Sequence, residues 1–301
     1  MICNICPHFC DLQDNQTGKC LVIKNLNGLI QNPYDGIISS LNVDSIEKRP
    51  LFHYYPGSKF LSASSYGCSF ACDFCFNYSV SQTVDVGKKI SALELYKIHQ
   101  QKETKGICFT FNEPSLSYKY IEELSKYENN IVLKTNGFFN KHIFDSLIKS
   151  TKAWNVDIKG DEEEYARICK GSLQPVLDTI EYCYDKIHLE ISYLVLPRMI
   201  DNYNFHEQIR SFISKLNINI PFHLLYYYPF HNMTESCYPM CSLHKLKDFF
   251  REKLNYVYVS NTTQKKVRNT YCPSCNDLLI ERDSTTKINK LICCNVNQFV
   301  V

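Results

Sequence analysis

Three cysteines in one short loop are the residues of this chain with the clearest chemical potential. Cys68, Cys72 and Cys75 follow a C-x3-C-x2-C spacing, and Phe74 and Phe76 flank Cys75. A loop of this length can place three thiolates around one cubane iron–sulfur cluster, which ordinarily takes four cysteine ligands. Three ligands leave one iron open to a small molecule. A zinc knuckle is the alternative, but zinc sites usually contain two C-x2-C pairs, so the spacing favours the cluster.

A second group of cysteines lies at the amino-terminal end of the sequence. Cys3, Cys6, Cys10 and Cys20 are spaced C-x2-C-x3-C-x9-C. Four thiolates can hold either a tetrahedral zinc ion or an auxiliary iron–sulfur cluster. We therefore expect a separate metal site here. A purely structural role is the alternative to a part in the chemistry, because closed four-ligand sites are usually structural.

A third group of cysteines lies near the carboxyl-terminal end. Cys272 and Cys275 form a C-x2-C pair, and the vicinal pair Cys293 and Cys294 follows after 17 intervening residues. Two pairs at this separation are typical of a zinc ribbon. A ribbon normally keeps two residues inside each pair, so the vicinal pair puts the fourth ligand in doubt. Zinc is favoured over an auxiliary cluster because it needs no assembly machinery.

The elements that must position the cysteine triplet form a regular alternation between about residues 60 and 260. Short apolar or β-branched runs are followed by polar or Gly/Pro turns and then by helical stretches, which predicts βαβ units and a parallel sheet. The expected strands are near 61–64, 107–111, 131–133, 153–156, 187–195 and 222–227. The expected helices are near 92–101, 116–127, 141–149, 176–184, 205–216 and 243–254. Six units are too few to close a full eight-stranded barrel.

Polar signatures follow each of the six expected strands, where the strand ends. Ligands of parallel α/β folds bind at the carboxyl ends of the strands, so we expect these signatures to converge on one mouth of the sheet. In chain order they are the cysteine loop, Asn112-Glu113-Pro114, Thr135-Asn136-Gly137, Asp157 with Lys159, Pro197-Arg198 and Pro229-Phe230-His231.

In this combination the chain resembles a known enzyme family. The triplet spacing is the signature of radical S-adenosylmethionine (SAM) enzymes. The whole pattern is similar to the AmmeMemoRadiSam-system family, which is related to the pyruvate formate-lyase (glycyl-radical) activating enzymes. The motifs that carry the likeness besides the triplet are 46–53, Tyr55-Pro56-Gly57, 110–114, Lys134-Thr135-Asn136-Gly137 and 155–160.

The resemblance implies a fold, cofactors and a reaction. The fold would be a partial (β/α)6 TIM-like barrel with small cysteine-rich modules at both ends. A [4Fe–4S] cluster would cleave SAM reductively, and the resulting 5′-deoxyadenosyl radical would abstract hydrogen from a substrate. The activating enzymes suggest a protein or peptide substrate, with an α-hydrogen of glycine as one candidate. A one-electron donor such as flavodoxin or ferredoxin would be a partner.

The resemblance also assigns cofactor-binding residues around the triplet. Glu113 occupies the acidic position of the motif that holds the SAM ammonium group in these enzymes. Asn112 precedes it and, with Phe111, replaces the glycines of that motif, so a bulkier backbone approach must be tolerated. Phe74 and Phe76 would exclude water from the cluster and lie near the adenine.

Five further residues complete the expected site. Thr135 and Asn136 would hydrogen-bond the SAM carboxylate or ribose, although Asn136 also begins an ordinary Asn-Gly turn. Asp157 and Lys159 match the Asp-x-Lys element of the activating enzymes and are the expected catalytic pair, with a surface salt bridge as the alternative. His231 matches a further position of these enzymes, with a structural or solvent-facing role as the alternative.

Composition limits the possible classes of protein. The 301 residues are 45% hydrophobic and 21% charged, and the net charge is +2, which argues against nucleic acid as a partner. No apolar run reaches the roughly 18 residues that span a bilayer. The start of the chain lacks the features of a signal peptide, so we expect a cytoplasmic protein. The 16 cysteines then argue for metal binding instead of disulfides.

We expect four parts in the chain. Residues 1–30 would form the amino-terminal four-cysteine module, 31–59 a connecting arm, 60–260 the radical SAM core and 261–301 the carboxyl-terminal knuckle module. Two other functions remain as alternatives. One is a non-catalytic iron–sulfur or zinc-binding protein on a barrel scaffold, and the other is a radical SAM enzyme that acts on RNA or a small metabolite.

Overall fold

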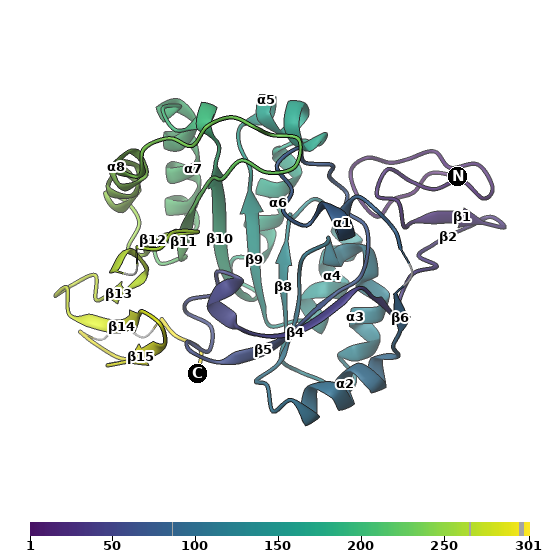
Figure 1. The fold of residues 1–301 in the computed structure, drawn as a ribbon, viewed down its shortest axis with the longest axis horizontal. Helices are drawn as coiled ribbons and strands as arrows, with labels where there is room; N and C mark the ends of the chain where they lie inside the picture. The colour runs from purple at the N-terminus through teal and green to yellow at the C-terminus, as the bar shows by residue number, and fades with distance from the viewer. Residues whose placement is uncertain (86, 265, 295–297) are drawn as a thin grey trace.

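The computed structural model describes residues 1–85, 87–264, 266–294 and 298–301. Within these ranges, eight strands form one central sheet in the order β12-β11-β10-β9-β8-β7-β5-β4 (Figure 1). Strand β4 pairs antiparallel with β5, and all the other neighbours are parallel. The predicted α/β fold with a large parallel sheet is therefore confirmed.

All six predicted strands are present, and β12 adds a seventh parallel strand. Helices cover the outer face of the parallel strands, which is apolar, whereas the inner face also carries buried polar side chains such as Asn155, Glu190 and His223. Their bounds are β5 Lys59–Ser64, β7 Ile107–Phe109, β8 Ile131–Thr135, β9 Ala153–Ile158, β10 His188–Val195, β11 Phe222–Tyr226 and β12 Val257–Ser260, with β4 at Ser40–Ser45.

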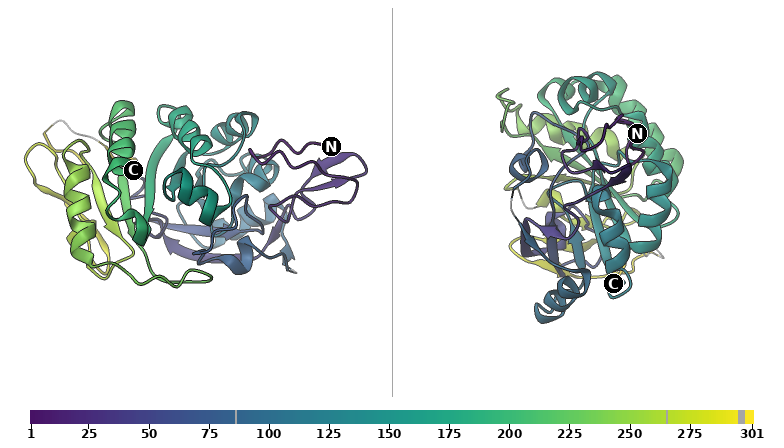
Figure 2. Two further views of the ribbon diagram at one scale, coloured as in Figure 1. Left: turned by 90° about the horizontal axis from the view of Figure 1, so that it is seen from above. Right: turned by 90° about the vertical axis from the view of Figure 1, so that its right-hand side faces the viewer.

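Helices follow the parallel strands and pack on the outer face of the sheet (Figures 1 and 2). Their amphipathic faces and the sheet enclose the main apolar core. Helix α2 starts with a capping box between Ser91 and Glu94. The longer helices are α2 Ala92–Gln101, α3 Tyr118–Leu124, α4 Lys141–Ser150, α6 Gln174–Cys183, α7 Tyr203–Leu216 and α8 Met240–Arg251. The short ones are α1 Tyr78–Ser81, α5 Glu162–Glu164, η1 Ile46–Lys48, η2 Pro114–Ser117, η3 Tyr165–Cys169, η4 Pro197–Met199 and η5 Lys266–Arg268.

The inner face of the barrel is polar at one end. Glu190 on β10 is fully buried and accepts hydrogen bonds from the backbone N–H groups of Phe52 (2.9 Å) and His53 (2.7 Å). Its oxygens also pair with the imidazoles of His188 (3.0 Å) and His223 (2.7 Å). Because a buried carboxylate is stable only with such partners, this cluster fastens the segment before β5 to the middle of the sheet.

Small sheets form the two ends of the molecule. The amino-terminal hairpin of β1 Lys24–Leu26 and β2 Leu29–Gln31 and the carboxyl-terminal sheet lie at opposite ends of the long axis (Figures 1 and 2). The remaining strands are β3 Ile37–Ile38, β6 Lys88–Lys89, β13 Thr270–Tyr271, β14 Leu278–Arg282 and β15 Thr286–Ile288. Among the described residues, no helix is long and apolar enough to cross a membrane.

Candidate metal and cofactor site

A cavity of about 370 Å³ lies at the carboxyl ends of strands β5, β7, β8 and β9. Its size is that of a typical cofactor site. All three cysteines of the triplet line it, and so do most of the other predicted site residues. The predicted residues in the lining are Cys68, Cys72, Cys75, Phe74, Phe76, Asn112, Glu113, Thr135, Asn136, Asp157 and Lys159.

The cysteine loop is held by backbone hydrogen bonds to distant segments. The N–H of Ala71 donates to the carbonyl of Cys169 (3.1 Å), and the N–H of Glu113 donates to the carbonyl of Gly67 (3.1 Å). Gly67 has a φ of +84°, and a Cβ at this position would lie 2.6 Å from the carbonyl oxygen of Cys20. Only glycine allows this close approach, which brings the amino-terminal module against the start of the loop.

Each thiol of the triplet has a hydrogen-bonding side chain next to it. The Nδ2 of Asn136 lies 3.5 Å from the Sγ of Cys68, and the Oγ of Ser81 lies 3.1 Å from the Sγ of Cys75. The hydrogen bond with the Cys169 thiol, together with burial, raises the pKa of Cys72 well above its usual range. Hydrogen bonds to cluster sulfurs are one of the ways in which a protein sets the reduction potential of an iron–sulfur centre.

The triplet fits the donor set of a three-cysteine iron–sulfur cluster. Burial raises the pKa of Cys68 and of Cys75, and in each case nearby thiols of the triplet raise it further. Three ionised thiolates that repel one another in a dry pocket need a compensating cation. Metal binding supplies this charge and displaces the thiol protons.

Glu113 is fully buried and lies between two strand ends. Its carboxylate accepts hydrogen bonds from the Thr135 hydroxyl (2.7 Å), the Asn136 N–H (2.8 Å) and the Ser115 N–H (3.0 Å). Burial raises the pKa of Glu113, and these donors offset part of that effect. Each carboxylate oxygen can accept two hydrogen bonds, so the group retains capacity for a cationic ligand in the cavity.

The two residues before Glu113 show how the motif works without glycine. Phe111 has a φ of +74°, a left-handed conformation that normally favours glycine. The Arg49 guanidinium lies 4.6 Å from the centre of the Phe111 ring, which stabilises this conformation by a cation–π contact. Asn112 accepts from the Ser65 N–H (3.1 Å) and donates to the Tyr66 carbonyl (3.1 Å), so its amide braces the end of β5.

Asp157 and Lys159 form the predicted ion pair, and a second lysine joins it. The Nζ of Lys159 lies 3.2 Å from one oxygen of Asp157, and Lys134 binds the other oxygen. Burial would raise the pKa of Asp157, but the two lysines lower it overall. Burial would lower the pKa of Lys159, but Asp157 and the thiols of Cys72 and Cys169 raise it well above its usual range. The trio therefore carries a net positive charge next to the cysteine loop.

Two of the six strand-end signatures do not line the cavity. Arg198 pairs with Glu235 on the surface (3.2 Å). His231 lies in an outer turn, where its ring stacks on Tyr78 with 4.3 Å between the ring centres. The neighbouring Phe230 stacks on Phe76 (4.6 Å), so this turn contacts the rim of the cavity through an aromatic pair.

The four amino-terminal cysteines lie close together beside the cysteine loop. Burial raises the pKa of Cys3 and of Cys20, and it raises that of Cys6 to about 12, with electrostatic contributions among the four thiols. His8 donates from Nε2 to the carbonyl of Ser69 in the loop (2.8 Å). The module is thus joined directly to the segment that carries Cys68.

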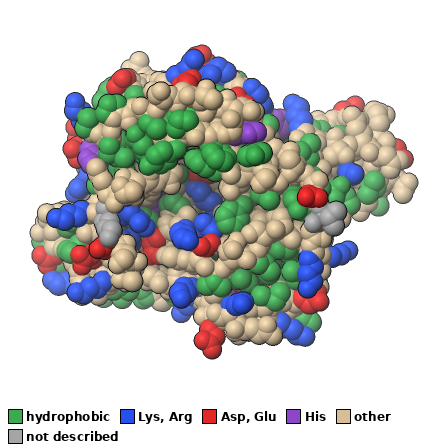
Figure 3. Space-filling model, in the orientation of Figure 1, with side chains coloured by type: hydrophobic (Ala, Val, Ile, Leu, Met, Phe, Trp, Pro, Cys, Tyr) green, Lys and Arg blue, Asp and Glu red, His purple; other side chains and the backbone are tan. Residues whose placement is uncertain are grey.

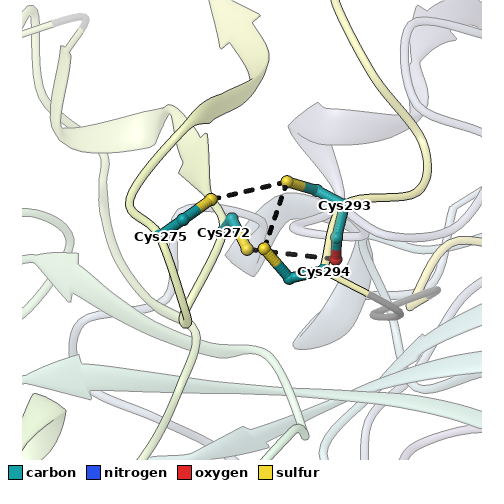
Figure 4. Close-up of side chains that lie close together, drawn as sticks. All are labelled: Cys272, Cys275, Cys293 and Cys294. Carbon is teal, nitrogen blue, oxygen red and sulfur yellow. Dashed lines mark hydrogen bonds between the residues drawn. The ribbon is translucent and has the colours of Figure 1, made fainter.

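The four carboxyl-terminal cysteines form a tighter group (Figure 4). Within the described part of the chain, they are the one set of three or more metal-ligating side chains whose ligand atoms all lie within 4.8 Å of one another. The Sγ of Cys293 is 3.5 Å from that of Cys275 and 3.9 Å from that of Cys294. Both sulfurs of the vicinal pair therefore belong to this group of four candidate metal ligands. Hydrogen bonds from the backbone of Cys275 lower the pKa of Cys272 to about 7.

Sequence reasoning missed several residues of the site. Lys134 and Arg49 lie within the motifs that resemble the family, but the sequence assigned them no role. Ser81 and Cys169 lie in no recognisable motif. Five further cysteines lie outside the three cysteine groups. Cys108, Cys169 and Cys183 are buried, as the sequence predicts for most of the five, whereas Cys237 and Cys241 are exposed.

Comparison with known sequences identifies relatives along almost the whole chain. Residues 63–204 match the family described as the Radical SAM superfamily. An uncharacterized protein of Methanocaldococcus jannaschii is 31% identical over 294 residues, which span 93% of this chain and 87% of that protein. A second protein of that organism, provisionally named a glycyl-radical enzyme activating enzyme, is 28% identical over 181 residues, spanning 56% of this chain and 67% of that protein.

Solved structures share the fold at low sequence identity. Streptococcus suis SuiB bound to S-adenosylmethionine superimposes with a TM-score of 0.54 at 15% identity, over 65% of this chain and 48% of that chain. A radical SAM methyltransferase from Sphaerobacter thermophilus gives a TM-score of 0.51 at 12% identity, over 68% of this chain and 67% of that chain. The present chain thus spans about half the length of SuiB, and these likenesses concern the fold alone.

Proposed function

Because the chain belongs to the radical SAM superfamily, we propose that its cysteine-lined cavity performs SAM-dependent radical chemistry on a protein or peptide. Enzymes of this superfamily use a [4Fe–4S] cluster and SAM, so these are its cofactors. When bound, they supply one electron and a 5′-deoxyadenosyl radical that abstracts hydrogen. The observation that carries the proposal is the convergence of three thiols, a buried carboxylate and a lysine–aspartate–lysine trio on one cavity.

The ligand roles follow from charge and position. Cys68, Cys72 and Cys75 would hold three irons, and Glu113 would accept a hydrogen bond from the SAM ammonium group. Asp157 and Lys159 would orient polar groups of SAM and balance the charge of the thiolates. Phe74, buried beside Cys75, would keep water from the cluster. Thr135 and Asn136 would act mainly by orienting Glu113 and the cysteine loop, since their side chains already bond to Glu113, Cys68 and Ser69.

The substrate class rests on the named relative. Its provisional name assigns it to the enzymes that activate glycyl-radical proteins, which act on a polypeptide. A protein or peptide with an accessible glycine α-hydrogen is therefore our first candidate. A ferredoxin or flavodoxin in the cytoplasm would supply the electron.

Anaerobic cleavage of SAM tests this proposal. The reconstituted and reduced protein should convert SAM to methionine and 5′-deoxyadenosine, which are measured by chromatography. Replacing Cys68, Cys72 and Cys75 together with Ala should abolish both the cleavage and the reduced-cluster resonance that shifts on addition of SAM. A wild-type protein with an intact cluster that fails to cleave SAM would favour the non-catalytic alternative.

A further inference from the structure

A second cavity opens beside the cysteine-lined one. It has a volume of about 350 Å³, and Lys48, Arg49 and Asn261 line both cavities. Ser260, the last residue of β12, and Arg268 of η5 line the second cavity alone. A ligand group bound in this second cavity would therefore lie next to the predicted radical site. Figure 3 shows Lys and Arg side chains inside the hollow at the centre of the molecule's face.

The cations that line the second cavity outnumber the acidic groups available to them. One carboxylate, that of Asp44, is shared by Lys48 (2.7 Å) and Arg49 (2.6 Å). Arg268 has no ion pair in the part of the chain that the structure describes. The second cavity therefore has a surplus of positive charge, which favours an anionic ligand.

The one acidic residue in the lining is already committed to other partners. The carboxylate of Glu47 accepts hydrogen bonds from the Gly57 N–H (2.6 Å) and the Thr286 hydroxyl (2.9 Å). The Nε of Arg282 lies 3.9 Å from the same oxygen. Glu47 thus ties the carboxyl-terminal sheet to the segment before β5 and does not neutralise Arg268.

Two residues in the lining carry polar atoms without a partner. The Nε of Arg49 and the Oγ of Ser260 are buried, and neither has a hydrogen-bond partner among the described residues. Arg49 is 9% exposed and Ser260 is 7% exposed. A buried donor that lacks a partner is unfavourable, so a ligand with acceptor oxygens would be stabilised at these groups.

We propose that the second cavity binds a carboxylate of the polypeptide substrate while the residue to be modified lies in the cysteine-lined cavity. A carboxylate offers two planar acceptor oxygens that suit a guanidinium, here that of Arg268. It is also the anion that every peptide carries, in an acidic side chain or at its carboxyl end. This inference rests on the proposed function and adds a feature of the substrate that the function alone does not specify.

Calorimetry on the anaerobically reconstituted protein tests the inference. The probe is a tri-glutamate peptide with blocked ends, titrated at constant ionic strength; blocked tri-glutamine and inorganic phosphate are the comparison ligands. Arg268→Gln should weaken tri-glutamate binding about tenfold, since the loss of one charge-assisted hydrogen bond approaches the 1.4 kcal/mol that this factor represents. Lys266→Gln, an exposed lysine of the same η5 turn, is the matched control and should bind as the wild type does.

Three results would overturn the inference. The first is an equal loss of tri-glutamate affinity in Arg268→Gln and Lys266→Gln. The second is binding of phosphate that depends on Arg268, without any binding of tri-glutamate. The third is an unchanged tri-glutamate affinity in Arg268→Gln. Ser260→Ala is the second variant in case Arg268→Gln fails to fold, and it should also weaken tri-glutamate binding. The titration needs no turnover, so failure of the wild-type protein to cleave SAM would overturn the proposed function, whereas the peptide affinities alone decide the carboxylate site.

Discussion

Glu113 combines two tasks that are usually assigned to different residues. Its carboxylate joins β8 to η2 through the hydroxyl of Thr135 and the N–H groups of Asn136 and Ser115. It also lines the cysteine-lined cavity, where the SAM ammonium group is expected. A negative charge buried with three donors is held rigidly, and a rigid acceptor loses little conformational entropy when a cationic ligand binds.

We predict that Glu113→Gln weakens SAM binding by about ten- to a hundredfold. A charge-assisted hydrogen bond in a partly dry site is worth roughly 1.5–3 kcal/mol, and 1.4 kcal/mol is a factor of ten. Titration of the reduced-cluster resonance with SAM measures the affinity and the cluster content together. The iron content should stay normal, because Glu113 is not a proposed iron ligand.

Glu128→Gln is the matched control for this substitution. Glu128 is also a buried carboxylate that accepts hydrogen bonds, from His99 (2.8 Å) and the Asn130 N–H (2.6 Å), but it does not line the cysteine-lined cavity. Glu128→Gln should leave the affinity for SAM unchanged. If Glu113→Gln binds SAM as tightly as the control does, the carboxylate serves only to join the strand ends.

At the scale of elements, the two outer cysteine modules differ in how tightly their sulfurs gather. Four thiolates around one zinc ion at 2.3 Å are about 3.8 Å apart. The sulfurs of the carboxyl-terminal module match this spacing, with 3.5 Å and 3.9 Å between neighbours. The amino-terminal thiols interact electrostatically but do not form such a tight group in the described structure. In a cubane cluster each cysteine sulfur binds a different iron, so the four sulfurs lie farther apart than they do around a single zinc ion.

We therefore predict an auxiliary [4Fe–4S] cluster in the amino-terminal module and zinc in the carboxyl-terminal one. Metal analysis after anaerobic reconstitution should give roughly eight irons and about one zinc per chain. Replacing Cys3, Cys6, Cys10 and Cys20 with Ser should remove half of the iron and leave the zinc. Replacing the four carboxyl-terminal cysteines with Ser should remove the zinc and leave the iron content unchanged. Four irons without any other metal would contradict both assignments.

At the scale of the whole molecule, one buried polar network joins the segment before β5, the sheet and the carboxyl-terminal sheet. The Nε2 of His53 lies 2.6 Å from the hydroxyl of Tyr258, which in turn lies 2.8 Å from that of Thr270. Arg282 donates from Nη2 to the carbonyl of Phe52 (2.6 Å). Because each partner comes from a different part of the chain, the network forms only when all three parts are assembled.

We predict that His53 makes the stability of the protein depend on pH. Burial lowers the pKa of His53 to about 3, whereas an unfolded histidine titrates near 6.5. Between these values the unfolded chain binds a proton that the folded chain does not, so stability is full above about pH 6.5 and falls as the pH decreases. From pH 7 to pH 5 the loss from this one group is about 2 kcal/mol.

Urea unfolding of the reconstituted protein at pH 7 and pH 5 measures this loss. His53→Gln keeps a donor and an acceptor but does not titrate, so the free energy of unfolding of this variant should fall by about 2 kcal/mol less over the same interval. An equal pH dependence in both proteins would show that His53 is protonated in the folded state as well.

The sequence alone determined the features that depend on neighbouring residues. The triplet spacing, the alternation of strands and helices, and the motifs around Glu113 and Asp157 are local patterns, and they led to the correct family, cofactors and fold class. Such patterns can be recognised in a sequence because a cluster loop or a strand–turn–helix unit is built from consecutive residues. Even the uncertain vicinal pair, Cys293 and Cys294, lies in the group to which its spacing pointed.

Only the tertiary structure decided which distant segments meet. It brought Cys169 against Cys72, added Lys134 to the pair of Asp157 and Lys159, and left His231 on an outer turn. The seventh strand, β12, and the second cavity beside it also had no counterpart in the predicted elements. These contacts depend on strand order, on register and on how far each loop reaches across the barrel, and no spacing within one segment encodes them.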